Sequence, residues 1–414
     1  MIFTQDVKTP WANWNKVLFR FLFLYGCGYI FFMFAGRLFE GLFVWVGETI
    51  FNSQGRLEYF LTGSGDTTMA YISLFVQAVL AVAGAILWSI LDRKRPSYNQ
   101  LFYWFTVILR IFIIFFMFTY GFVKIFKTQF AGPSLMRLMQ PIGEMSPMGL
   151  AWTYMAQSEG FNLFAGGMEV LGGLLLIPRR TQTLGAMVTM GVMLQVAMMN
   201  FFYDIPVKLF SVNLILLAAI IFFADIKRFV NVFIRNRAVD KAKYYKPSED
   251  SHYNKLIFWL KVICTAGLIT LFSFQGYSRE RNYGDKRQKP PLYGIWEVTH
   301  FVKNGDTLAP LVTDKERWRY LIIDRAERAS IKLMNDSIVR ESFTVDTTNS
   351  KVYMASSNGV DDALGFKKVG DTELQIKGIS NYDSIEIHLK AKDLSKIPLI
   401  NRGFHWINEY PHNR

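Results

Sequence analysis

Two charged residues lie inside apolar stretches of the sequence, Arg110 within residues 101–123 and Glu169 within residues 161–177. A charge in the hydrocarbon of a bilayer costs about 3 kcal/mol or more, so such residues are partnered and usually functional. At about 1.5 Å of helix rise per residue, both lie about 14 Å from the same end of their stretches. Because consecutive spans run in opposite directions, we predict an ion pair between Arg110 and Glu169 that shapes a pocket or carries protons.

The stretches around these charges are typical of a membrane protein. Hydrophobic residues make up 51% and aromatic residues 16% of the 414-residue chain. A helix needs about 17 to 25 apolar residues to cross a bilayer. The stretches that qualify are residues 16–36, 70–91, 101–123, 161–177, 182–202, 209–226 and 256–275. They predict a mainly α-helical membrane protein with about seven transmembrane helices; six or eight are the alternatives, if one stretch is re-entrant or if residues 41–51 insert.

The distribution of lysine and arginine predicts the orientation of the chain, because basic loops resist translocation. The connections 92–100, 178–181 and 227–255 are rich in these residues, whereas 37–69 and 124–160 are poor for their length. With seven spans, this pattern predicts a cytoplasmic N-terminus and an external segment after residue 275. Most of the net charge of +13 is explained in the same way, by basic residues that set the topology and interact with anionic lipid. We therefore expect the lipid bilayer, and no nucleic acid, as a partner.

From about residue 290 the pattern changes to short alternating strands separated by turns, with eight or nine candidates between 293 and 391. Short, evenly spaced strands predict an all-β domain, either a barrel or a sandwich. The opening Gly294-Ile295-Trp296 resembles the first-strand signature of lipocalin-like, or calycin-like, barrels. In those barrels the Trp plugs one end and a late Arg stacks on it, a role that this resemblance gives to Arg402.

The C-terminal segment 401–414 is dense in aromatic, basic and titratable residues. We expect it to dock the β domain onto headgroups or outer loops, with catalysis as the alternative. His405 and Glu409 would share a helical face, but two ligands without a third do not define a zinc site, so no metal is predicted. Cys27 and Cys264 both fall inside spans and are predicted to be small buried hydrophobic residues.

Polar residues also gather near the predicted outer ends of the later spans: Gln195, Asn200, Asn213, Asp204 and Lys208. They predict a polar pocket that opens outward, with Asp204 and Lys208 as candidate catalytic groups beside Arg110 and Glu169. A desolvated lysine such as Lys208 could act as a base. The alternative is that these side chains only hydrogen-bond the helices together or, for Lys208, reach the interface.

Two local signals predict helix starts in the outward loops. Ser146-Pro147 combines a good N-cap with a proline in the first turn, and predicts an amphipathic helix on the outer surface that could act as a lid. Asp66, just before the second span, is predicted to cap the helix of that span.

The sequence around Glu169 carries a resemblance to a known family. Residues 120–124 (Tyr-Gly-Phe-Val-Lys) end one span, and residues 166–181 contain Glu-Val-Leu-Gly-Gly followed by Ile-Pro-Arg-Arg-Thr. This pattern resembles the DoxX-like family of four-helix membrane proteins over about residues 101–226. The match is to a long form met in Bacteroidota, with extra spans and an exported β domain. The resemblance implies a four-helix bundle associated with membrane redox chemistry, and functional roles for Arg110, Lys124 and Glu169.

Taken with the polar residues, this resemblance predicts a quinone-linked redox component of the bacterial inner membrane, with a periplasmic β domain. A membrane quinone would be the cofactor, its headgroup hydrogen-bonded by Asn200, Asp204 or Lys208; Lys124, Asn213 and Gln195 complete the candidate binding residues. One alternative is a non-catalytic assembly subunit that binds an envelope or membrane protein through its β domain. The layout also resembles the membrane module of vitamin K-dependent carboxylases, which implies a quinol-driven enzyme. A transporter ranks below these, because no clear internal repeat is visible.

Four regions follow from this interpretation. Residues 1–100 form an N-terminal two-helix membrane region, and residues 101–226 the DoxX-like four-helix bundle. Residues 227–289 contain a cytoplasmic basic loop, the last transmembrane helix and a linker that begins near residue 276. Residues 290–414 form the periplasmic β domain.

Overall fold

The structure is a computed structural model that describes residues 10–53, 57, 62–239, 248–355 and 361–413. Its contacts divide the chain into two compact units. The first comprises Met1–Gln129 and Gly160–Arg279, and the second comprises Phe130–Glu159 and Glu280–Arg414.

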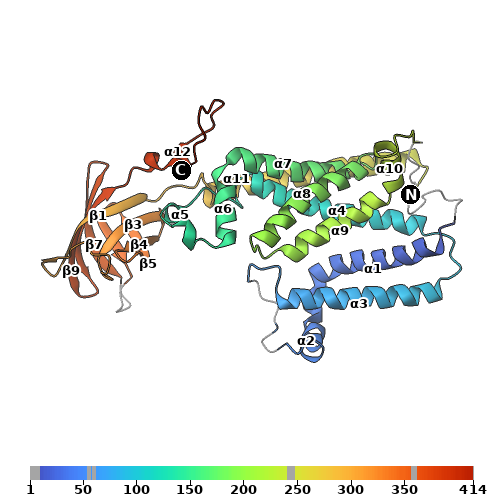
Figure 1. The fold of residues 1–414 in the computed structure, drawn as a ribbon, viewed down its shortest axis with the longest axis horizontal. Helices are drawn as coiled ribbons and strands as arrows, with labels where there is room; N and C mark the ends of the chain where they lie inside the picture. Colours follow the sequence, from blue (N-terminus) through green and yellow to red (C-terminus); the bar gives the residue numbers. More distant parts are fainter. Residues whose placement is uncertain (1–9, 54–56, 58–61, 240–247, 356–360, 414) are drawn as a thin grey trace. The chain divides into compact units, whose positions relative to one another are not determined.

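The first unit is helical (Figure 1). In it α1 lies beside α3, and α8 lies beside α9. The elements are α1 Asn13–Ala35, the 3-10 helix η1 Gly36–Phe39, α2 Glu40–Thr49, α3 Thr68–Leu91, α4 Asn99–Ile125, α7 Glu159–Leu176, α8 Gln182–Phe202, α9 Lys208–Phe223, α10 Ile226–Phe233 and α11 Ser251–Asn282.

Within the described residues, five helical segments are long and apolar enough to cross a bilayer: Asn13–Thr49, Thr68–Leu91, Asn99–Ile125, Gln182–Phe202 and Ser251–Asn282. A sixth span results if α9 and α10, which meet at a bend of 73°, are counted together. The chain is therefore a membrane protein. The predicted fourth span forms α7, which is not among these segments because its glycines and Glu169 make it less apolar. The last span runs on to Asn282, so the predicted linker begins later than expected.

A third charged residue within the predicted spans, Arg20 of α1, is 3% exposed. Its Nε donates to the Tyr98 hydroxyl at 2.9 Å, its Nη1 to Ser89 Oγ at 2.9 Å, and its Nη2 to the Asp92 carbonyl at 2.8 Å. The Phe19 ring stacks on the same Tyr98, with centroids 5.2 Å apart. Arg20 thus joins α1 to the end of α3 and the turn before α4.

Helices α4 and α7 are in direct backbone contact through glycines. A Cβ atom added to Gly121 would lie 2.8 Å from the Gly166 carbonyl oxygen, and one added to Gly166 would lie 2.5 Å from the Gly121 carbonyl oxygen. A Cβ at Gly173 would likewise come within 2.8 Å of the Phe118 ring. Small residues permit such close approach between membrane helices, as the Glu169 face of α7 was expected to do. This contact fixes the register of α4 against α7.

The second unit contains an up-and-down antiparallel barrel. From β3 to β9 each strand pairs with the next. β1 pairs with both β3 and β9, which closes the ring, and the short β2 pairs with the end of β1. The strands are β1 Gly294–Lys303, β2 Asp306–Thr307, β3 Trp318–Arg325, β4 Arg328–Leu333, β5 Ile338–Asp346, β6 Lys351–Met354, β7 Asp362–Val369, β8 Glu373–Ser380 and β9 Asp383–Ala391. The predicted all-β domain is confirmed, and it is a barrel, not a sandwich.

The barrel core is built from alternate residues of the strands. Phe343, Leu364 and Ile387 are at most 1% exposed within it. Trp296 is also buried, and its indole N–H donates to the Leu292 carbonyl at 2.9 Å. Arg402 is exposed and donates to Asn408 Oδ1 at 2.6 Å, so its predicted stacking on Trp296 is wrong.

The segment before α7 packs within the barrel unit. Leu135 of α5 contacts Ile295, Tyr320 and Ile322 of the barrel strands. The predicted helix at Pro147 is confirmed, and the Ser146 hydroxyl accepts the Gly149 N–H at 3.1 Å as its N-cap. The remaining short elements are α5 Leu135–Leu138, η2 Ile142–Glu144, α6 Pro147–Gln157, η3 Leu394–Lys396 and α12 Pro398–Asn401.

The last helix, α12, ends before His405 and Glu409, so these two residues do not share a helical face as the four-residue spacing suggested. Among the described residues, no group of three His, Cys, Asp or Glu side chains is placed to hold a metal ion.

Adjacent glycines of α7 provide a matched test of the contact between α4 and α7. We expect Gly166→Ala to lower the free energy of unfolding by about 1–3 kcal/mol, because the new methyl group overlaps the Gly121 carbonyl oxygen. Gly167→Ala places its methyl group in open space and should be neutral or up to about 1 kcal/mol stabilising. Thermal unfolding of both variants in detergent measures the difference; equal effects would contradict the contact.

Candidate functional site

Glu169 is paired with Lys124 in the interior of the helical unit. The Lys124 Nζ atom lies 2.8 Å from Oε1 and 2.9 Å from Oε2 of Glu169. The two residues are 6% and 1% exposed, respectively. Lys124 belongs to the last turn of α4, and the Gly121–Gly166 contact places it against α7. The predicted ion pair between Arg110 and Glu169 is therefore wrong, although Lys124 and Glu169 were both expected at the site.

Arg110 instead binds the C-terminal end of α7. Its Nε donates to the Leu176 carbonyl at 2.6 Å, its Nη2 donates to the Ile177 carbonyl, and its Nη1 lies 3.5 Å from Gln182 Oε1. A helix ends in unpaired carbonyls with a partial negative charge, which favours a cation there. Arg110 and Glu169 lie at similar depths in their spans, which is why a pair was predicted. The register of α4 against α7 instead places Arg110 at the C-terminal end of α7.

Asp66 connects the start of α3 to the start of α9. Its carboxylate accepts the N–H groups of Lys208 and Leu209 at 2.8 and 2.9 Å, and so caps α9. The predicted cap of α3 by Asp66 is wrong, because the Thr67 hydroxyl takes that role and accepts the Ala70 N–H at 3.2 Å.

Asp204, in the turn after α8, forms an ion pair with Lys208, the first residue of α9. The Lys208 Nζ atom is 2.9 Å from Asp204 Oδ1 and 3.9 Å from Asp66 Oδ2. The Asp204 side chain is 86% exposed. These two candidate catalytic groups thus lie at the start of α9, close to a cavity but not in its lining.

A cavity of about 330 Å³ lies among α1, α3, α4 and α9. We call it the outer pocket, because it is lined by the helix ends that the basic loops predict to face outward. The lining residues are Tyr29, Phe32, Met33, Gly65, Ala70, Ser73, Leu74, Gln77, Phe116, Tyr120, Val207, Leu209, Phe210 and Asn213. Asn213 is the member of the predicted set that lines it.

The other predicted binding residues of this region lie elsewhere. Gln195 is exposed on α8, and its amide donates to Met199 Sδ of the same helix at 3.0 Å. The Asn200 amide donates to Ser211 Oγ at 3.1 Å and to the Val207 carbonyl at 3.3 Å, so it holds α8 against α9. Asn200 therefore hydrogen-bonds two helices together, which was the alternative to a role in binding.

The outer pocket offers several hydrogen-bonding groups to a ligand. The hydroxyls of Tyr29, Ser73 and Tyr120 line it and have no hydrogen-bond partner in the described part of the chain. By contrast, the Asn213 amide is engaged, since it accepts from the Tyr25 hydroxyl at 2.6 Å and donates to the Leu209 carbonyl at 2.8 Å. The cavity therefore presents mainly hydroxyl donors.

Aromatic rings and a nearby charge complete the pocket. The rings of Phe116 and Phe210 line it with centroids 4.8 Å apart. The Lys124 Nζ atom lies 5.6 Å from the centroid of the Tyr120 ring, within the range of a cation–π contact. Tyr120 thus contacts both the pocket and Lys124 of the buried pair.

Sequence reasoning missed Tyr29, Ser73 and Gln77, which come from the two N-terminal spans. Polar side chains inside the stretches 16–36 and 70–91 were the available signal. Uncharged polar groups in a membrane helix cost less than charged ones and are more common, so those of the two N-terminal stretches are a weak signal.

Comparisons with known proteins leave the class of membrane protein open. No family model matches the chain. The chain is 29% identical over 146 residues to the uncharacterized protein YwoB of Bacillus subtilis (strain 168), a match that covers 33% of this chain and 86% of YwoB. No solved structure matches.

Removing the partners of the buried pair singly and together tests the pairing. We expect Lys124→Met or Glu169→Leu alone to lower stability by about 3–5 kcal/mol, because the surviving charge is left buried and unpaired. The double variant should regain most of this loss. As a control, Arg110→Met combined with Glu169→Leu should show additive losses, since those side chains do not interact. Thermal unfolding in detergent distinguishes the two patterns; rescue by the Arg110 change instead would contradict the pairing.

Proposed function

We propose that this protein is a quinone-binding component of membrane redox chemistry, with the quinone headgroup in the outer pocket. The observation that carries the proposal is that Tyr29, Ser73 and Tyr120 line a cavity with aromatic walls, and that their hydroxyls have no hydrogen-bond partner among the described residues. The resemblance to DoxX-like proteins, some of which act with quinones, points in the same direction.

The residues of the outer pocket fit a quinone headgroup in size and chemistry. The volume of about 330 Å³ is at the lower end of the range of about 300–1,000 Å³ typical of small-molecule sites. Quinone carbonyls accept hydrogen bonds, and the three hydroxyls are donors. Phe116 and Phe210 provide rings against which a flat headgroup can pack.

A bound quinone would supply two-electron chemistry coupled to proton uptake. In this proposal the chain's own residues orient the headgroup and supply protons at its oxygens. Tyr29, Ser73 and Tyr120 hold the oxygens, and Tyr120 lies between them and the Lys124 ammonium group.

To test this proposal, the binding of a short-chain quinone analogue to the purified protein can be measured by isothermal titration in detergent. Tyr29→Phe should weaken binding about fivefold, because it removes one hydrogen bond worth about 1 kcal/mol. Tyr71→Phe is the matched control on α3, since Tyr71 is 49% exposed and does not line the pocket.

Filling the cavity gives an independent check. Ala70→Trp places a large ring in the outer pocket and should abolish binding of the analogue, while the unfolding temperature reports whether the variant is folded. Binding that survives Ala70→Trp, or that falls equally with Tyr71→Phe, would place the quinone elsewhere and refute the proposal.

We further propose that the protein resides in the bacterial inner membrane, with α7 crossing the bilayer, the N-terminus in the cytoplasm and the barrel in the periplasm. The contact between α4 and α7 supports a full crossing by α7, because the contact extends from Gly121–Gly166 to Arg110 at Leu176. An alkaline phosphatase moiety fused after Arg414 should then be active in cells. A fusion that is expressed but inactive would contradict this topology.

A second candidate function is that of an assembly subunit whose barrel unit binds an envelope protein. The observation that favours it is the C-terminal segment, where Phe404, Trp406, Ile407 and Tyr410 are 76–90% exposed. A partner that stays bound in stoichiometric amount when Glu169 is replaced, but is lost when residues after Asn401 are removed, would favour this function over quinone chemistry.

A further inference from the structure

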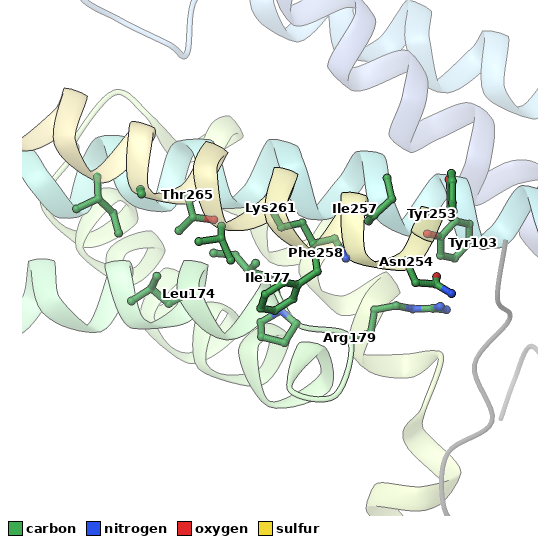
Figure 2. A pocket seen from close by; sticks show the side chains of 14 residues that line it. Tyr103, Leu174, Ile177, Arg179, Tyr253, Asn254, Ile257, Phe258, Lys261 and Thr265 are labelled. Atoms are coloured by element: carbon green, nitrogen blue, oxygen red, sulfur yellow. The ribbon is translucent and has the colours of Figure 1, made fainter. Parts of the chain in front are cut away.

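A second cavity lies between α11 and the ends of α4 and α7 (Figure 2). Its volume is about 610 Å³, and we call it the inner groove. A neighbouring cavity of about 360 Å³ shares Tyr103, Arg179 and Lys261 with it and is also lined by Arg110. The walls come from the helix ends that the basic loops predict to face the cytoplasm, so the inner groove is independent of the outer pocket and of its proposed quinone.

The charges along the inner groove are all positive. Arg179 and Lys261 line it, and Lys261 interacts electrostatically with both Arg179 and Arg110. Among the residues that the structure describes in the lining of the two cavities, none is acidic. Within the described residues, Lys261 has no carboxylate within 4.0 Å. A lysine in a membrane helix without a counter-ion is costly, so an anionic ligand would be stabilised there.

Polar and apolar groups are separated along the groove. Figure 2 shows Tyr103, Tyr253, Asn254 and Arg179 gathered at one end, with Leu174 toward the other. The Arg179 guanidinium lies 4.6 Å from the centroid of the Tyr103 ring, which orients it by a cation–π contact. The rest of the wall is mostly apolar, and the residues that form it are Ile177, Ile257, Phe258, Val262, Ala266 and Ile269.

Helix α11 has unused apolar surface beside this groove. None of the residues in its apolar window is buried inside the protein. Phe258 is 59% exposed although it lines the groove. A ligand with a long apolar tail would cover this surface and hold α11 against α4 and α7.

We propose that the inner groove binds an anionic phospholipid. Lys261 and Arg179 bind the phosphate, Asn254 and Tyr253 contact the polar headgroup, and one acyl chain lies along α11 toward Leu174. Three features support this occupant over a zwitterionic lipid or a protein helix: the like charges, their position at the cytoplasmic end, where the membrane surface is negative, and the apolar wall that continues from them.

The proposal is tested by native mass spectrometry of the full-length, delipidated protein, titrated with phosphatidylglycerol or with phosphatidylcholine of the same acyl chains. We expect phosphatidylglycerol to bind at least tenfold more tightly. Lys261→Gln should reduce this preference about tenfold, and Lys261→Arg should retain most of it. Lys255→Gln is the matched control, because Lys255 is exposed on the same helix and lines neither cavity.

Two further measurements keep the result interpretable. The unfolding temperature shows whether Lys261→Gln is folded, and it should not fall in the absence of lipid. Binding of the quinone analogue shows whether the outer pocket is intact, and it should not change. Equal binding of the two lipids would overturn the proposal, as would an equal loss of preference with Lys255→Gln. Binding of inorganic phosphate that displaces phosphatidylglycerol at millimolar concentration would also overturn it, by assigning the site to a soluble anion.

Discussion

The backbone contact between Gly121 and Gly166 is the constraint on which the membrane unit depends. It brings α4 and α7 so close that no side chain fits between them, and it thereby sets their register. That register places Lys124 beside Glu169 near one end of the helix pair and Arg110 beside the Leu176 carbonyl at the other. Each of the costly charges is thus compensated within the α4–α7 interface. A buried ion pair of this kind adds little net stability. Separating its two charges is strongly destabilising, so the pair favours this register over registers in which the charges would be apart.

The same compensation explains why the two cavities differ in charge. Near the outer pocket, Glu169 neutralises Lys124, and the groups left for a ligand are uncharged hydroxyls. Near the inner groove, the carbonyls at the end of α7 satisfy the hydrogen bonds of Arg110 but carry no net charge. Arg110, Arg179 and Lys261 lie at that end, and the described residues that line the two cavities there include no acidic side chain. One cavity suits a neutral polar headgroup and the other suits an anion.

The fold was more predictable than the contacts of the site. The length of the apolar stretches predicted the helices, and the alternation of apolar and polar residues predicted the strands. The Ser146 cap depends on neighbouring residues alone and was predicted correctly. Asp66 shows the limit of such local reasoning. It sits beside the start of α3, where Thr67 competes for the same cap, and its carboxylate binds N–H groups of α9 that are 142 and 143 residues away. The register of α4 against α7 also depends on a contact between residues far apart in the sequence. Several glycines could have formed this contact, and their spacing alone does not show which of them does.

The outer pocket also shows what a family resemblance confined to residues 101–226 omits. Three residues that line the cavity have hydroxyls without a partner among the described residues. Tyr29 and Ser73 belong to α1 and α3, outside that region, and Tyr120 lies within it. Gln77 of α3 adds a further polar group from outside. A four-helix bundle alone would retain the Lys124–Glu169 pair and one wall of the pocket but would lose most of its hydrogen-bonding groups. The two N-terminal helices therefore contribute most of the hydrogen-bonding groups of this pocket, and α4 and α7 contribute the Lys124–Glu169 ion pair beside Tyr120.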